Sequence, residues 1–227
     1  MSIKKQTQKA MQQLRVVIVG HVDHGKSTLI GRLLYDTNSL PAGKYEELQD
    51  ICKRRGTDAL EWSFVLDAFQ AERDQAITID TTQIWFSTEA RDYVIIDAPG
   101  HREFLKNMIS GAAQADAAIL VVDATEGVRE QTKRHAYMLS LLGMRQIAVV
   151  VNKMDMVDHC TERFEQVSKE VDTYLKSIGL QANYIVPISA RERDMIASRG
   201  ASLGWYNGKS LVETLDCFEY ESPPLSR

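Results

Sequence analysis

The chain has 227 residues, which at about 150 residues per domain allows one large domain or two small ones. Hydrophobic residues make up 44 % of the sequence and charged residues 26 %, so a buried core is available and the disordered and low-complexity classes are excluded. The 27 basic and 31 acidic side chains give a formal net charge of −4. That balance argues against a general nucleic-acid-binding domain, because such domains usually carry a net basic face.

Short apolar runs rich in Val and Ile recur along the chain, and runs of this length between turn residues are typical of strands buried on both faces. They are Arg15–Val19, Tyr93–Asp97, Ala118–Val122, Ile147–Val151 and Tyr184–Ile188. Segments with helical spacing follow the first four runs, at Ser27–Leu34, Phe104–Ala113, Thr132–Leu142 and Thr161–Ile178. This alternation predicts an α/β fold of three layers, with right-handed crossovers between mostly parallel strands.

Two further elements complete the expected fold. Thr82–Ser87 precedes the Tyr93 run at hairpin spacing, so we expect it to be a sixth strand, antiparallel and at the edge of the sheet. A helix is expected near Leu211–Phe218. We therefore predict one domain over residues 14–220, with an N-terminal tail at 1–13 and a linker tail at 221–227.

Ser39–Gln75 is a long polar stretch without a buried-strand pattern, although Lys44–Lys53 and Ala59–Phe69 could each be helical. We expect an insertion with little core of its own, which usually serves a site or a partner. The three cysteines form no C-x-x-C pair, so neither a disulfide framework nor a zinc site is indicated and a reducing cytoplasm is expected. No run approaches the roughly 18 apolar residues of a membrane helix, so no membrane association is expected.

Gly20-His21-Val22-Asp23-His24-Gly25-Lys26-Ser27 matches G-x-x-x-x-G-K-[ST] directly after the first strand and before a helix. Such a loop points backbone N–H groups and the positive end of a helix dipole at phosphates. Lys26 would reach the β and γ phosphates, and the Ser27 hydroxyl suits Mg²⁺. The motif predicts a P-loop NTPase fold and leaves open whether the nucleotide carries adenine or guanine.

Asp97-Ala98-Pro99-Gly100-His101 follows the second buried run, at the sheet edge where ligands bind in open α/β folds. The carboxylate of Asp97 is placed to hold Mg²⁺ through water, as in the P-loop template. Gly100 lets a backbone N–H approach the γ-phosphate, because no Cβ intervenes. His101 is then expected to orient the attacking water.

Asn152-Lys153-Met154-Asp155 follows the fourth run, and Ser189-Ala190 follows the fifth. Asp155 can accept hydrogen bonds from N1–H and the exocyclic amine of guanine, and adenine offers no such pair of donors. An unpaired buried carboxylate is costly, so adenine should be rejected. Asn152 is expected to support the loop and reach N7, Lys153 to lie along the base, and the Ala190 N–H to meet O6.

With these motifs in place, the chain resembles the GTP-binding domain of the translation-factor class of GTPases over roughly Leu14–Pro224, including the specific His-Val-Asp-His inside the phosphate loop. The resemblance implies that His101 orients the water, that Asp23 would help to bind a monovalent cation, and that Val22 and Ile77 form an apolar gate. It also implies a first switch over about 39–80 and a second over about 97–113. Thr78 would add a second hydroxyl to Mg²⁺, but Ala76 stands where the family usually has Gly.

The predicted site thus has three sets of residues. The catalytic set is His101, Lys26 and Thr78, and the metal-binding set is Ser27, Thr78 and Asp97. The set expected to bind GTP or GDP is Gly20, His21, Val22, Asp23, His24, Gly25, Lys26, Ser27, Thr28, Gly100, Asn152, Lys153, Asp155, Ser189 and Ala190.

The resemblance leaves the biological setting open between two families. The stretch 127–135 resembles the GTPase subunit of sulfate adenylyltransferase, which would imply a small catalytic subunit as partner, and this interpretation is favoured. Residues 97–108 look more like elongation factors, which would imply aminoacyl-tRNA and the ribosome. A third alternative is a nucleotide-gated scaffold with negligible hydrolysis. Both families carry two β-barrel domains after this one, and the isolated domain is expected to be monomeric.

Overall fold

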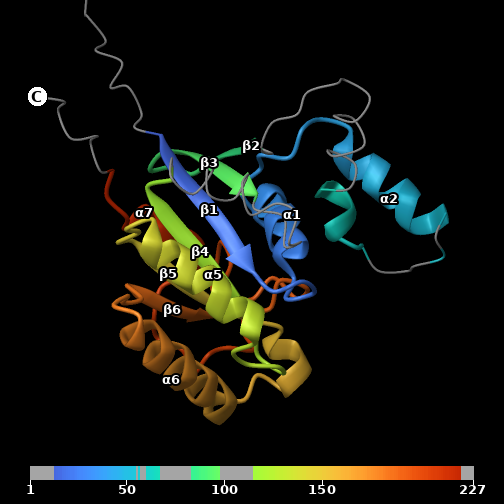
Figure 1. Cartoon of the computed structure of the whole chain (residues 1–227). Coiled ribbons are helices and arrows are strands. Elements are labelled where there is room, and N and C mark those ends of the chain that lie inside the picture. The colour runs from blue at the N-terminus through green and yellow to red at the C-terminus, as the bar shows by residue number, and fades with distance from the viewer. Residues whose placement is uncertain (1–12, 55, 57–59, 67–82, 98–114, 221–227) are drawn as a thin grey trace, which may run out of the picture.

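The structure is a computed structural model that describes residues 13–54, 56, 60–66, 83–97 and 115–220. In this part of the chain, six strands form one sheet in the order β2-β3-β1-β4-β5-β6 (Figure 1). Their bounds are β1 Leu14–Gly20, β2 Gln83–Ser87, β3 Asp92–Asp97, β4 Ala117–Asp123, β5 Ile147–Asn152 and β6 Tyr184–Pro187. Neighbouring strands are parallel except for β2 and β3, which are antiparallel. The predicted mostly parallel sheet with one antiparallel edge strand is therefore confirmed.

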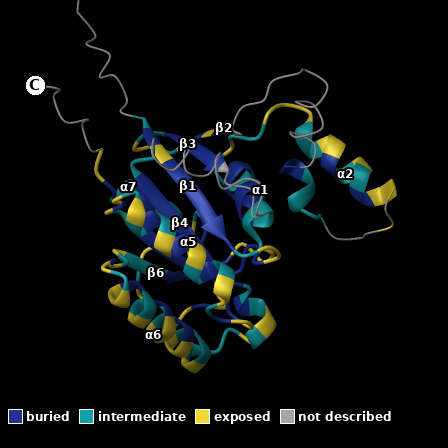
Figure 2. Cartoon of the chain, viewed as in Figure 1, coloured by how far each residue is buried: buried dark blue, intermediate teal, exposed yellow. Residues whose placement is uncertain are grey.

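The burial of the strands follows from their composition. Every residue of β4 and of β5 is buried, as expected for runs of Val, Ile, Leu and Ala in strands covered on both faces. The edge strand β2 alternates instead, because Ile84 and Phe86 face the core whereas Trp85 is exposed. Figure 2 shows that the centre of the sheet is buried, whereas the outer faces of the helices are exposed.

The helices cover both faces of the sheet. They are α1 Lys26–Asp36, α2 Lys44–Arg54, α5 Glu130–Leu141, α6 Thr161–Ser177 and α7 Leu211–Asp216, with a 3₁₀ helix, η2, at Met154–Val157. The strand order reverses direction at β1, so right-handed crossovers place α1 on one face and α5 and α6 on the other. Figure 1 shows α5 and α6 in front of the sheet. The helix predicted at 104–113 lies outside the described residues.

The insertion differs from its prediction. Lys44–Arg54 is helical as expected, and residues 63–66 of the second predicted helix are helical too. However, Leu48, Cys52, Trp62, Val65 and Leu66 are buried in the main hydrophobic core, so the expectation of little core is wrong for these segments. The small size of Gly31 on α1 permits the contact, because a Cβ there would lie 2.3 Å from the Trp62 carbonyl oxygen.

Among the described residues, none of the helices combines the length and the hydropathy that crossing a membrane requires.

Candidate nucleotide-binding site

The predicted motifs meet at one edge of the sheet. Strand pairing sets Ile18 beside Asp97, Gly20 beside Val121, and Asp123 beside Asn152. All three pairs lie at the carboxyl ends of parallel strands, the first two on either side of β1, where the strand order reverses, and the third between β4 and β5. In open α/β sheets this switch point is the usual ligand site.

The phosphate loop runs from Gly20, the last residue of β1, to Lys26, the first of α1. Gly25 adopts φ +86°, a left-handed conformation that favours glycine. It also lies against Asn152, since a Cβ on Gly25 would be 2.4 Å from the Asn152 Nδ2 atom. Gly20 is needed as well, because the loop passes close to β4 there: a Cβ on Gly20 would lie 2.5 Å from the Val121 carbonyl oxygen.

Lys26 lies over the loop in this structure. Its Nζ donates hydrogen bonds to the carbonyl oxygens of Gly20 at 2.9 Å and His21 at 2.7 Å. Ser27 and Thr28 follow in the first turn of α1 and are half-buried, where the helix dipole favours anions. Val22 and Asp23 are exposed, and Asp23 has φ +64°.

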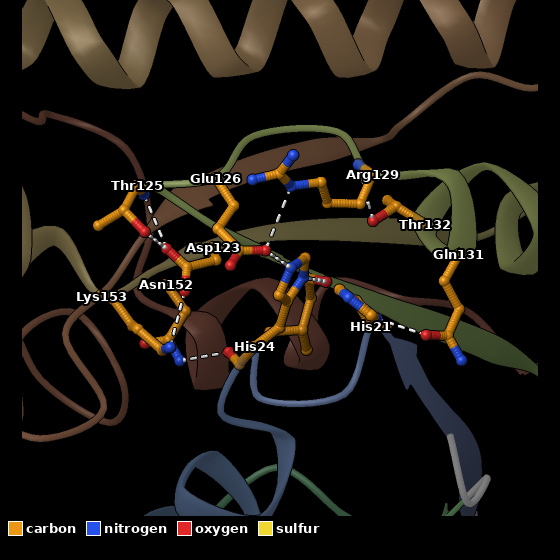
Figure 3. Close-up of polar contacts among 12 residues, drawn as sticks. His21, His24, Asp123, Thr125, Glu126, Arg129, Gln131, Thr132, Asn152 and Lys153 are labelled. Carbon is orange, nitrogen blue, oxygen red and sulfur yellow. Dashed lines mark hydrogen bonds and ion pairs between the residues drawn. The ribbon is translucent and has the colours of Figure 1, made fainter. Parts of the chain in front are cut away.

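The two histidines of the loop turn their side chains toward the β4–α5 connection (Figure 3). His24 is buried, with Nδ1 3.2 Å from the Val121 carbonyl oxygen and Nε2 3.3 Å from Glu126 Oε2. His21 is hydrogen-bonded to Gln131. Burial lowers the pKa of His24 despite these partners. These side chains therefore stabilise the loop. We expect His21 and His24 to contact a nucleotide through their backbone N–H groups only.

A third histidine, His135 of α5, is buried close to this cluster. Burial, together with the positive charge of Lys26, lowers the pKa of His135 to about 4. Its Nδ1 has no hydrogen-bond partner among the described residues. The imidazole is therefore neutral at physiological pH and behaves as part of the core.

Asn152 joins the phosphate loop to the loop after β6. Its Nδ2 donates to the His24 carbonyl oxygen at 2.9 Å, and its Oδ1 accepts from the Ala190 N–H at 3.1 Å. The side chain is almost completely buried, and both ends of the amide are satisfied. Asn152 thus contacts the phosphate loop directly, and its contact with N7 of the base stays a prediction. The Ala190 N–H, expected to meet O6 of guanine, is engaged by Asn152 in this structure.

Lys153 and Asp123 form an ion pair that the sequence reasoning missed. Lys153 Nζ lies 2.7 Å from Asp123 Oδ2, and Asp123 Oδ1 accepts from the N–H of Thr125 at 2.7 Å and its hydroxyl at 2.6 Å. Burial would raise the pKa of Asp123, but the hydrogen bonds from Lys153 and Thr125 outweigh burial and lower it. Its position at the end of β4, equivalent to that of Asp97 on β3, is the signal that could have identified it.

Asp155 is oriented by the next loop. Ser189 Oγ donates to Asp155 Oδ1 at 2.7 Å and accepts from the Glu192 N–H at 3.2 Å. Asp155 is the second residue of η2. This helix begins directly after Lys153, whose φ of +64° turns the chain at the end of β5. The carboxylate is thus held in one direction by a neighbouring hydroxyl.

One cavity of about 710 Å³ connects the two motifs. Its lining includes Gly25 from the phosphate loop, Thr28 from the first turn of α1, and Asn152, Lys153, Asp155 and Ala190 from the base motifs. This volume falls in the range of small-molecule sites, about 300–1,000 Å³. The sequence motifs therefore converge on a space of the size that a nucleotide requires.

The insertion also reaches this cavity, through Leu60, Glu61 and Trp62, which the sequence reasoning did not assign to the site. Arg32 of α1 lies over the Trp62 ring at 4.8 Å and pairs with Asp36 at 3.1 Å. Asp36 also lies 3.1 Å from Arg193. Burial lowers the pKa of Arg32, although Asp36 opposes this effect.

Several predicted residues cannot be placed in the same way. Thr78, Gly100 and His101, and with them Ala76 and Ile77, lie outside the described residues. Asp97 is described only as the last residue of β3, paired with Ile18 of β1. The predicted metal ligands are hydroxyl and carboxylate oxygens, from Ser27, Thr78 and Asp97, and this donor set fits Mg²⁺, a hard cation.

The chain is similar to known proteins over most of its length. Residues 11–219 match the family described as elongation factor Tu GTP binding domain. Elongation factor 1-alpha of Pyrococcus furiosus is 45 % identical over 96 % of this chain and 51 % of the relative, and that of Thermococcus onnurineus is 46 % identical over 95 % and 50 %. The chain thus spans about half the length of these relatives.

Solved structures are also similar to this chain. The structure of sup35 complexed with GMPPNP is 27 % identical with a TM-score of 0.62, over 94 % of this chain and 47 % of that one. Translation elongation factor SelB from Methanococcus maripaludis, in complex with the GTP analogue GPPNHP, is 26 % identical with a TM-score of 0.60, over 95 % of this chain and 36 % of that one.

Proposed function

Because this chain belongs to the family of elongation factor Tu GTP-binding domains, we propose that it binds GTP and GDP and hydrolyses GTP to GDP and phosphate. The observation that carries the proposal is the shared cavity, whose lining brings Gly25 and Thr28 of the phosphate-binding segment together with Asn152 and Asp155 of the base motif. A triphosphate at the first pair and a purine at the second would fill one continuous space.

Guanine recognition is proposed to depend on Asp155. Its carboxylate is fixed by Ser189 and lines the cavity, so it is positioned to accept hydrogen bonds from N1–H and the exocyclic amine. Adenine would leave the carboxylate unpaired, which is the more costly outcome. O6 of guanine would then share or replace the bond that the Ala190 N–H now makes with Asn152.

At the phosphate end, we propose that Lys26 exchanges its bonds to the loop carbonyl oxygens for contacts with the β and γ phosphates. The loop N–H groups and the start of α1 would hold the same anion. Ser27, Thr78 and Asp97 would hold Mg²⁺, which when bound neutralises charge on the phosphates. A monovalent cation near Asp23 remains a prediction of the family resemblance.

The hydrolytic step is proposed to need a water oriented by His101, with Gly100 close to the γ-phosphate. The remainder of catalysis is positioning and charge stabilisation, since phosphoryl transfer to water requires little covalent chemistry from the protein. The GTP state would order the switch segments, about 39–80 and 97–113, and hydrolysis would release them. Turnover by the chain alone should be slow until a partner completes the site.

For the biological setting, we propose the elongation-factor alternative, with aminoacyl-tRNA and the ribosome as partners in the cytoplasm. Its support is the similarity of about 45 % to elongation factors 1-alpha across 96 % of the chain. This favours the alternative over sulfate activation with a small catalytic subunit, for which neither the fold nor the relatives reported above offer support. The limits of the domain, 14–220, and its monomeric state remain predictions.

Phosphate release from GTP under single-turnover conditions tests the proposed activity. With Mg²⁺ and ribosomes, release should exceed that of the chain alone by at least about tenfold, which is 1.4 kcal/mol of barrier. ATP in place of GTP should give no release. Absence of stimulated release with a fully GTP-loaded chain would favour the scaffold alternative instead.

A further inference from the structure

Three potential metal ligands converge beside the nucleotide cavity, on two segments that the mechanism does not use for chemistry. His159 follows η2, and Glu192 and Asp194 lie in the loop after β6. The Nε2 atom of His159 is 3.0 Å from Glu192 Oε2 and 3.7 Å from Asp194 Oδ2. All three ligand atoms lie within 4.8 Å of one another.

These separations suit a small divalent cation. Zinc–nitrogen and zinc–oxygen bonds of about 2.0–2.2 Å place neighbouring ligands of a tetrahedral site about 3.3–3.6 Å apart. The two distances from His159 bracket this range, so small side-chain adjustments would bring all three atoms onto one ion.

The carboxylate of Asp194 independently indicates a ligand at this place, because one of its buried oxygens has no hydrogen-bond partner among the described residues. The residue is only 5 % exposed, and its Oδ2 has no hydrogen-bond partner among the described residues. The 3.7 Å separation from His159 Nε2 is too long for a hydrogen bond. A buried carboxylate oxygen left in this way is unfavourable unless another group satisfies it.

The backbone holds these residues in place. Asp194 exchanges two backbone hydrogen bonds with Ser189, each 3.2 Å long. Its carboxylate fills the space over Gly200, where a Cβ would lie 1.2 Å from Asp194 Oδ1. The His159 N–H donates to the Met154 carbonyl oxygen at 2.8 Å, and the His159 carbonyl oxygen accepts from Trp205 Nε1 at 2.8 Å. The ligands are thus presented by a fixed framework.

We propose that His159 Nε2 and the carboxylates of Glu192 and Asp194 bind a divalent transition-metal cation of the zinc class, with water completing the coordination. The imidazole ligand favours zinc, cobalt or nickel over Mg²⁺ and Ca²⁺, which prefer oxygen donors. A protonated His159 paired with Glu192 is the simplest competing arrangement, but it leaves Asp194 Oδ2 without a hydrogen bond. The cation would link the turn at His159 to the loop that carries Ala190.

The test uses Co²⁺, whose visible absorption reports coordination, and Zn²⁺ as competitor. The full chain is first saturated with Mg²⁺ and GDP, so that the proposed magnesium site is occupied; binding of Co²⁺ does not itself require the nucleotide. We expect one Co²⁺ per chain, displaced by Zn²⁺. His159→Gln and Asp194→Asn should each weaken binding by at least about tenfold, the cost that even an outer-shell substitution can produce.

Two neighbours provide matched controls. Asp158 is exposed and directly precedes His159. Cys160 directly follows His159, and its thiol donates a hydrogen bond to Glu162. Asp158→Asn and Cys160→Ser should bind Co²⁺ as the unmodified chain does. If Asp194→Asn fails to fold, His159→Gln and Glu192→Gln decide the question. Undetectable Co²⁺ binding, equal binding by His159→Gln, or loss of binding confined to Cys160→Ser would overturn the proposal.

Discussion

The side-chain amide of Asn152 donates a 2.9 Å hydrogen bond to the carbonyl oxygen of His24, 128 residues earlier in the chain. The same side chain accepts from the Ala190 N–H at 3.1 Å. One buried residue therefore ties the phosphate loop to the loop expected around the base. A residue for which a base contact is predicted therefore also joins two loops that line the cavity.

We predict that Asn152→Ala destabilises the fold and weakens nucleotide binding together. Two buried backbone groups would lose their partner, at a cost of about 1–3 kcal/mol in the free energy of unfolding. Urea denaturation and GDP titration measure the two effects. Asn152→Asp keeps an acceptor for the Ala190 N–H but sets a carboxylate oxygen against the His24 carbonyl oxygen in a buried position, so it should destabilise the fold at least as much as Asn152→Ala. Unchanged stability in Asn152→Ala would contradict the structural role.

Gly25→Ala should abolish nucleotide binding through a clash as well as through backbone strain. The new Cβ would lie 2.4 Å from Asn152 Nδ2, at φ +86°. Gly43 is the matched control, since it has φ +82° but no atom within 4 Å of an added Cβ. Both substitutions carry the left-handed penalty of about 1–2 kcal/mol. Only Gly25→Ala should lose GDP affinity in a direct titration, and equal affinity in the two variants would rule out the clash.

Asp155→Asn should exchange guanine for xanthine preference. The amide cannot accept the pair of donors that guanine presents, whereas it can donate to the O2 of xanthine. Competition between GDP and xanthosine diphosphate measures the change, with Ser189→Ala testing the orientation of the carboxylate. Unchanged GDP affinity with no gain for the xanthosine nucleotide would remove Asp155 from base recognition.

His101→Ala should leave GTP binding nearly unchanged and depress stimulated hydrolysis by at least about tenfold, or 1.4 kcal/mol of barrier. The reason is that orientation of the water matters only during the reaction. Single-turnover phosphate release with the activating partner is the measurement. A full rate in this variant would exclude His101 from the mechanism.

The buried, neutral imidazole of His135 should make the folded chain less stable in mild acid. Its pKa in the folded chain is about 4, below its ordinary value of about 6.5, so below pH 6.5 the unfolded chain binds a proton that the folded chain does not. The stabilisation is present above pH 6.5 and declines as the pH falls toward 4, by on the order of 3 kcal/mol in total. Urea unfolding at pH 7 and pH 5 should show the decline, and His135→Gln should show less of it.

Most of the fold could be predicted because its strands are short apolar runs that only a doubly covered sheet can bury. β4 and β5 are the clearest examples, since all their residues are buried. The insertion was misjudged because Leu48, Cys52 and Trp62 are scattered among polar residues. Trp62 meets α1 at Gly31, and this contact has no signature in local periodicity.

The candidate site divides in the same way. Gly25 and Asp155 could be proposed from the sequence because a motif fixes their spacing. The place of Asp123 at the end of β4 could have marked it as a candidate, but its pairing with Lys153 and the contact of Arg32 with Trp62 arise through tertiary packing. The engagement of the Ala190 N–H by Asn152 likewise depends on the end of β5 meeting the loop after β6 and could not be derived from either segment alone.

Calorimetric titration of the folded chain with GDP and with ADP, in the presence of Mg²⁺, tests guanine-nucleotide binding most directly. We expect one GDP to bind per chain and ADP to bind at least about a hundredfold more weakly, a difference of 2.7 kcal/mol. Equal affinity for the two nucleotides, or no binding of GDP by chain shown to be folded, would contradict this expectation.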